Sequence, residues 1–287
     1  MTVGRRIEAL RLQSPFLVRS VTPRIDSING RTILSARRMG KRIVLGMDQE
    51  LYLILHLMIA GRLRWRKPGT TATGRWVLAA LDFEQGTLLI TEAGSRKRAS
   101  LYLVEGEAAV REHDPEGLEV LEAQFETFDE VLRSENHTLK RALTDPHLFS
   151  GIGNAYSDEI LHAARLSPLQ RTQQLGEAER RRLFDACRDT LKEWTVRLLA
   201  EVGDGFPEKV TAFREGMTVH GRYRQPCPIC SAPVQRIVHA ENESNYCPQC
   251  QTAGRLLADR ALSRLLRDDW PKSWEDLETR RSGPHRR

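Results

Sequence analysis

Two Cys-x-x-Cys pairs near the C-terminal end limit how this chain can fold more than any other feature. Cys227 and Cys230 form the first pair and Cys247 and Cys250 the second, with 16 residues between the pairs. Tight turns at this spacing can point four thiolates at one tetrahedral zinc ion. Because four sulfur ligands leave no open coordination position, the pattern predicts one structural Zn²⁺ and argues against a catalytic metal.

The residues between the two pairs predict a β-hairpin pinned by the metal. Residues 234–239 alternate apolar and polar as a strand does, and residues 239–245 would form the tip. By spacing alone, such a hairpin is equally suited to a stabilising clasp and to a surface that contacts a partner. The fifth cysteine, Cys187, lies in a helical pattern over 180–199 and is expected to be a small core residue.

The first part of the chain, from residue 1 to about 112, has the pattern of an all-β domain. Short apolar runs are interrupted by Gly, Asp or Glu, as in a β-sandwich or barrel. Residues 113–124 have the composition of a connection. Strands are expected at 42–47, 51–59, 76–83 and 87–91.

The apolar period becomes helical from Phe125 to about Leu199. Helices are expected around 125–132, 137–143, 157–165, 176–199 and 256–266, before a basic tail at 280–287. The chain as a whole therefore predicts a multidomain α+β fold. Its expected parts are a β-sandwich at 1–112, a helical domain at 125–218, a zinc finger at 219–251, and a C-terminal helix and basic tail at 252–287.

The charge balance weakly favours a polyanionic partner. The sequence holds 44 Lys and Arg against 38 Asp and Glu, a net charge of +6. The longest apolar run, 51–60, is too short to span a membrane, and the first residues lack the apolar core of a secretion signal. We therefore expect a cytoplasmic protein with no membrane partner.

A Gly-Ile-Gly-Asn turn at 151–154 is the second informative stretch. Its glycines permit a left-handed backbone or the close approach of a ligand, and a helix is expected to begin near Asn154. Backbone amides at a helix start suit a phosphate, and Asn154 could either cap the helix or donate to that phosphate. An ordinary corner between two helices has the same pattern, so both interpretations stay open.

Taken together in order and spacing, these stretches resemble the formamidopyrimidine-DNA glycosylase family, which includes the endonuclease-VIII-like enzymes. The resemblance runs from about residue 2 to residue 251 and rests on the strand-rich first half, on 151–156 between two helices, and on 219–230 with 245–250. It implies a base-excision DNA repair enzyme that binds damaged double-stranded DNA as a monomer in a bacterial-type cytoplasm, associated with the nucleoid. The implied fold adds a helix–two-turn–helix domain and a zinc finger to the β-sandwich.

The implied chemistry is that of a bifunctional hydrolase, a DNA glycosylase with AP lyase activity. It excises an oxidised base and then cuts the strand at the abasic site through a Schiff base. The family nucleophile is the secondary amine of an N-terminal proline followed by Glu, whereas this sequence begins Met1-Thr-Val-Gly. That start resembles the junction after the family's first helix.

Two explanations for this departure stay open. The first, which we favour, is a start assigned at an internal Met. The second is a shortened, catalytically inactive protein that binds damaged or abasic DNA. A structural zinc-ribbon protein of another assembly is a third hypothesis, but it leaves Gly151-Ile-Gly-Asn154 and Lys41 unexplained.

Several further positions match the family pattern. Lys41 matches a catalytic-site lysine that reaches the DNA near the damaged sugar, where an ammonium group can pair with phosphate. His56 matches a histidine near the DNA backbone, Asn154 the phosphate-binding asparagine, and Lys140 a lysine of the same helical unit.

Other positions depart from it. Ile59, beside Met58, stands where the family commonly has a Met that fills the gap left by the extruded base. The Arg-Arg-Phe-Gly wedge aligns with residues 96–100, which hold no Phe, although Arg96 or Arg98 could still enter the duplex. Asn242 replaces an Arg at the hairpin tip, and nearby Arg236 could compensate as a DNA-binding residue.

Overall fold

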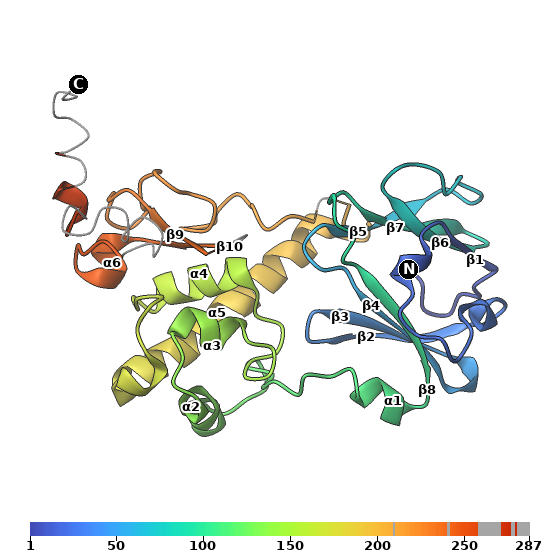
Figure 1. The fold of residues 1–287 in the computed structure, drawn as a ribbon, viewed down its shortest axis with the longest axis horizontal. Helices are drawn as coiled ribbons and strands as arrows, with labels where there is room; N and C mark the ends of the chain where they lie inside the picture. Colours follow the sequence, from blue (N-terminus) through green and yellow to red (C-terminus); the bar gives the residue numbers. More distant parts are fainter. Residues whose placement is uncertain (209, 240–241, 258–270, 277–278, 280–287) are drawn as a thin grey trace. The chain divides into compact units, whose positions relative to one another are not determined.

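The computed structural model describes residues 1–208, 210–239, 242–257, 271–276 and 279 (Figure 1). The chain divides into two compact units. The β unit comprises 1–115 and 199–210, and the helical–zinc unit comprises 116–198 and 211–287. Most of the predicted helix at 256–266 and all of the basic tail at 280–287 lie outside the described residues.

The β unit consists of two four-stranded antiparallel sheets, with strand orders β1-β6-β7-β5 and β2-β3-β4-β8. Leu45, Leu53 and Leu101 of one sheet share an apolar core with Leu81 and Ile90 of the other. The predicted β-sandwich is thereby confirmed. The strands are β1 Ala9–Leu12, β2 Ile33–Met39, β3 Arg42–Met47, β4 Leu51–His56, β5 Gly61–Arg66, β6 Val77–Phe83, β7 Gly86–Glu92 and β8 Ser100–Glu105.

The apolar runs correctly predicted β3, β4, β6 and β7, but the predicted strand at 51–59 is too long. It ends at His56, because the chain turns before β5 and Met58 takes a left-handed conformation with φ 54°. The apolar runs did not predict β2, whose sequence Ile-Leu-Ser-Ala-Arg-Arg-Met exposes its five central residues. They also did not predict β1, β5, β8 or a short helix, α1 Glu107–Arg111.

The helical–zinc unit contains the four helices predicted between residues 125 and 199, with small shifts at their ends. Its elements are α2 Phe125–Ser134, α3 Leu139–Thr144, α4 Asn154–Ala163, α5 Glu177–Val202, β9 Gln235–His239, β10 Asn242–Tyr246 and α6 Pro248–Thr252. The division between the units falls within α5. α3 begins after Thr138, whose side chain accepts a hydrogen bond from the Arg141 amide.

An apolar core joins the helices of this unit. The ring of Phe128 lies 5.0 Å from that of Phe149 and 5.2 Å from that of Phe184. Cys187 is fully buried in the same core, as predicted, and burial raises the pKa of its thiol far above the ordinary value. Among the described helices, none combines the length and the apolar character that a membrane crossing requires.

Candidate nucleic-acid interface and metal centre

The four cysteines of the two pairs converge at one end of the β9–β10 hairpin. The Cys230 sulfur lies 3.4 Å from that of Cys247 and 3.5 Å from that of Cys250, and the Cys227 and Cys250 sulfurs are 3.9 Å apart. Zn–S bonds of about 2.3 Å in a tetrahedron place the sulfurs about 3.8 Å from one another. The observed spacing fits one structural zinc ion held by four thiolates, as the sequence predicts.

A residue that the sequence did not single out also borders this site. His162, on α4, places its Nε2 3.4 Å from the Cys227 sulfur, and it belongs to a group with Cys227, Cys247 and Cys250 whose ligand atoms lie within 4.8 Å of one another. Because Cys230 already contacts two of the other sulfurs, an imidazole N–H donating to Cys227 suits this geometry better than a fifth ligand. His162 is 65 residues from Cys227, so spacing could not reveal it.

The Gly-Ile-Gly-Asn turn leaves the start of α4 open. Gly151 has φ 78°, a left-handed conformation that favours glycine, and Gly153 occupies the N-cap position. Among the residues that the structure describes, no side chain caps the helix, and no heavy atom lies within 4 Å of where a Gly153 Cβ would be. The described residues therefore leave open space beside the start of α4, and the amides of a helix start suit an anion.

The expectation that Asn154 might serve as the cap is wrong. Gly153 takes the extended cap conformation, so Asn154 becomes the first residue inside the helix. Its side-chain Nδ2 donates to the backbone oxygen of Glu243 on β10, at 3.0 Å. Asn154 thus ties the start of α4 to the zinc hairpin.

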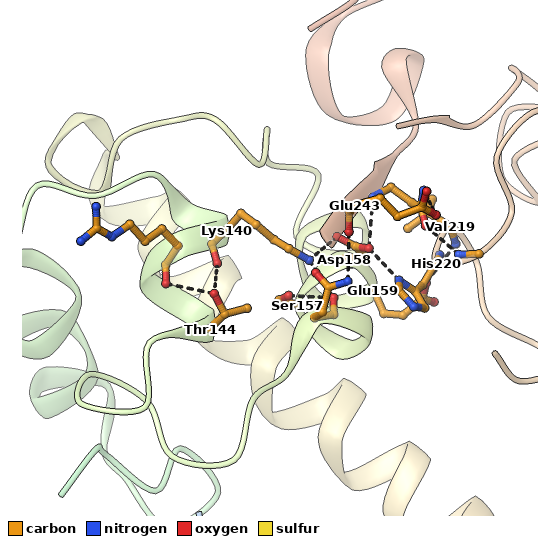
Figure 2. Close-up of polar contacts among 12 residues, drawn as sticks. Lys140, Thr144, Ser157, Asp158, Glu159, Val219, His220 and Glu243 are labelled. Atoms are coloured by element: carbon orange, nitrogen blue, oxygen red, sulfur yellow. Dashed lines mark hydrogen bonds and ion pairs between the residues drawn. The ribbon is translucent and has the colours of Figure 1, made fainter. Parts of the chain in front are cut away.

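A buried charged network continues this tie (Figure 2). Lys140 Nζ donates to Asp158 Oδ1 at 2.5 Å and to the backbone oxygen of Asn154 at 2.7 Å. The other Asp158 oxygen accepts from His220 Nδ1 at 2.8 Å and from the Asn245 amide at 3.1 Å. Burial lowers the pKa of Lys140, and the neighbouring Asp158 carboxylate opposes that change.

The neighbouring residue, Glu159, anchors the segment that leads into the zinc finger. One of its carboxylate oxygens accepts from the Thr218 amide at 2.7 Å, and the other from the amides of Val219 at 2.9 Å and His220 at 2.8 Å (Figure 2). Sequence analysis missed both Asp158 and Glu159. Two adjacent acidic residues directly before the apolar pair Ile160 and Leu161 were the available signal, because acidic residues are rarely buried without partners.

Arg236, predicted to contact DNA, lies on β9. Its guanidinium is 3.1 Å from the Glu243 carboxylate and 4.4 Å from the centre of the Tyr223 ring. The side chain remains 44% exposed, so these contacts orient it without burying it.

In the β unit, Lys41 and His56 lie close together. Lys41 occupies the turn between β2 and β3, and His56 pairs across the sheet with Arg42. Burial, with a smaller contribution from Arg42, lowers the pKa of Lys41. Burial likewise lowers the pKa of His56, followed by the charges of Arg42 and Lys41. The structure thus gathers a positive cluster at these strand ends.

The remaining predicted residues, Arg96 and Arg98, stand exposed on the loop between β7 and β8. The Glu92 carboxylate, 1% exposed at the end of β7, accepts from the Arg98 amide at 2.9 Å and the Ala99 amide at 3.2 Å. The backbone of this loop is therefore held in place from inside the β unit.

Comparison with known proteins agrees with this architecture along most of the chain. Residues 1–99 match the formamidopyrimidine-DNA glycosylase N-terminal domain, residues 115–198 the H2TH domain of the same glycosylase, and residues 224–253 a zinc finger found in FPG and IleRS.

Individual relatives cover similar lengths. A formamidopyrimidine-DNA glycosylase of Chloroflexus aurantiacus is 33% identical over 86% of this chain and 91% of its own length. An uncharacterized formamidopyrimidine-DNA glycosylase-like protein of Mycobacterium tuberculosis is 37% identical over 53% of this chain and 94% of its own length. Lactococcus lactis FPG (MutM), solved with a FAPY-dG containing DNA, is 25% identical with a TM-score of 0.77, covering 88% of this chain and 94% of that one. The chain therefore belongs to the formamidopyrimidine-DNA glycosylase family of DNA repair proteins.

Proposed function

We propose that this protein, in a form that carries the family's N-terminal Pro-Glu, excises an oxidised base from damaged double-stranded DNA and then cleaves the strand at the abasic site. The observation that carries the proposal is that the start of α4 is hydrogen-bonded to the zinc hairpin of the same unit. Asn154 and Asp158 of α4 make these bonds to β10, and among the described residues no side chain caps the helix. Both elements present donors to one polyanion. The Lactococcus lactis relative, solved with DNA that contains a damaged base, supports the choice of substrate.

In the helical–zinc unit, the first amides of α4 bind a DNA phosphate. The Asn154 side chain keeps these amides beside the hairpin through its hydrogen bond to Glu243. Lys140 stabilises the first turn of α4 by donating a hydrogen bond to the Asn154 backbone oxygen. Arg236 adds a cation from β9. Zinc, when bound, fixes the four thiolates and so holds the hairpin that carries Arg236.

In the β unit, the cluster of Lys41 and His56 binds the backbone near the damaged sugar, while Arg96 and Arg98 approach the duplex from their exposed loop. Desolvation of Lys41 strengthens its attraction to a phosphate, because the charge is less screened than on an open surface. Extrusion of the damaged base exposes C1′ of its sugar to attack.

The chemistry requires an amine. Its nitrogen bonds to C1′, the bond from C1′ to the base breaks, and the base leaves with the electron pair and takes up a proton. The bond from C1′ to the ring oxygen O4′ then breaks, and that oxygen takes up a proton, which leaves a Schiff base at C1′. Loss of a proton from C2′ of this Schiff base breaks the bond between C3′ and its phosphate oxygen, and the phosphate leaves with the electron pair. We assign to Lys41 the stabilisation of charge in this region, and the family's prolyl amine would perform the attack.

Reductive trapping tests the proposal. Borohydride converts a Schiff base between protein and abasic DNA into a stable amine, which migrates as a covalent complex on a denaturing gel. We expect trapping by a version that carries the family's first helix with its Met-Pro-Glu start. Trapping by the 287-residue chain alone would identify another amine, and its loss in Lys41→Met would assign it. Tight binding of abasic DNA with no trapping in either version would contradict the proposed activity.

A further inference from the structure

The loop at 94–99 lacks the aromatic residue of the family wedge, yet the fold places one against it. Trp76 precedes β6 and remains 38% exposed. Lys97 Nζ, from the loop, lies 4.7 Å from the centre of the Trp76 ring, and the guanidinium carbon of Arg75 lies 4.1 Å from it. Two cations thus lie against one surface indole.

The same residue, Glu92, fixes both sides of this arrangement. Its amide donates to the backbone oxygen of Trp76 at 2.8 Å, and its backbone oxygen accepts from Lys97 Nζ. Its buried carboxylate accepts from the amides of Arg98 and Ala99. Trp76 and the loop that carries Arg96 and Arg98 are therefore held to one point at the end of β7.

Resting on the function proposed above, we propose that Trp76, with Arg75 and Lys97, forms a platform that stacks one unpaired base of the damaged DNA. An exposed indole offers a flat apolar face to a base, and a stacked guanidinium is itself a plane on which bases stack. The two cations suit the phosphates that accompany any such base. A neutral apolar ligand would gain nothing from them.

Equilibrium binding of the whole chain to duplex DNA tests the platform. The probes are a duplex with a tetrahydrofuran abasic-site analogue and the same duplex without it, followed by fluorescence anisotropy at several salt concentrations. We expect Trp76→Ala to weaken binding of the abasic-site duplex roughly tenfold, the scale found for removing a stacked aromatic. Trp76→Phe should retain most of the affinity. Phe16→Ala is the matched control, because Phe16 is an exposed aromatic residue of the same unit, 74% accessible.

Salt dependence separates stacking from charge. Trp76→Ala should leave the slope of log K against log salt unchanged, because no phosphate contact is removed. Arg75→Ala should lower that slope by about one if its guanidinium also neutralises a phosphate. A changed slope in Trp76→Ala would contradict stacking as the role of the indole.

A direct readout comes from 2-aminopurine placed opposite the abasic-site analogue, since stacking quenches its fluorescence. We expect the wild-type chain to quench the fluorescence of 2-aminopurine and Trp76→Ala to leave that fluorescence unchanged. Equal affinity and equal quenching in the two proteins would contradict the stacking role of Trp76 without contradicting the proposed function. Arg75 and Lys97 would then only shield the indole from solvent. A wild-type chain without preference for the abasic-site duplex would overturn the proposed function, and with it the ligand assigned to Trp76.

Discussion

The two units hold their candidate DNA-binding groups in opposite ways. In the helical–zinc unit, Lys140 is 13% exposed in its side chain, and Asp158, its partner, is 1% exposed as a residue. In the β unit, Arg96 and Arg98 project from a surface loop whose backbone is held by Glu92. Charge that is buried must be paired for the fold to survive, whereas charge on an anchored loop can change with little effect on folding. Substitutions should therefore affect stability first in the helical–zinc unit and DNA binding first in the β unit.

The largest expected effect is removal of the zinc ligands. Cys247→Ser should release the metal and unfold the hairpin, because structural zinc contributes on the order of 10 kcal/mol in apparent binding free energy. Zinc content and calorimetric unfolding measure the result, with Cys187→Ala as the control, since that buried cysteine lies outside the metal centre. Full zinc content and an unchanged unfolding profile in Cys247→Ser would contradict the assigned ligand set.

The next largest effect concerns Asp158. Asp158→Ala removes the carboxylate partner of the Lys140 ammonium, which keeps only the Asn154 oxygen, and leaves the Asn245 amide without its acceptor. Breaking a buried ion pair in this way costs about 3–5 kcal/mol. Denaturant unfolding measures the loss. Lys140→Met combined with Asp158→Ala should recover part of it, because no unpaired charge remains.

Asp26→Ala is the matched control in the β unit, since Asp26 pairs with Arg24 on the open surface. This variant should unfold with the wild-type midpoint. Equal destabilisation by Asp26→Ala and Asp158→Ala would remove the difference between the two units.

The sequence predicted most of what depends on local chemistry. The cysteine spacing and the apolar runs of β3 and β4 determine structure through neighbours in the chain, and they were correctly interpreted except for the end of β4. The glycine turn predicted the start of a helix near Asn154 but not that Gly153 is its cap. The residues it missed depend on partners far along the chain: Glu159 with Thr218, 59 residues away, and His162 with Cys227, 65 residues away. β5 was missed because arginines alternate with its half-buried apolar residues, and β2 was missed because its five central residues are exposed. Trp76 was missed because only the fold brings it to Lys97.

The third prediction turns to the β unit, where binding should respond before stability. Lys41→Gln should weaken binding of abasic-site duplex DNA roughly fivefold to tenfold and lower the salt slope by about one, since one phosphate contact is lost. Lys67→Gln removes the same charge from an exposed loop of the same unit and serves as the control. Anisotropy titrations at several salt concentrations measure both variants, and equal losses would show that net charge alone governs binding. The midpoint of thermal unfolding should stay close to that of the wild type.

The smallest expected effect is the pH dependence that His56 adds to stability. Burial, Arg42 and Lys41 lower its pKa in the folded chain, so that below the ordinary value of about 6.5 the unfolded chain binds more protons than the folded one. Stability linked to His56 is therefore fully present above pH of about 6.5 and is lost as the pH falls toward the folded pKa. His56→Gln removes this linkage, so its free energy of unfolding should fall less than that of the wild type between about pH 7 and pH 5. If the free energies of unfolding of the two proteins changed with pH in parallel, His56 would have the same pKa in the folded and unfolded chain. The neighbouring charges of Arg42 and Lys41 would then not destabilise the fold when His56 is protonated.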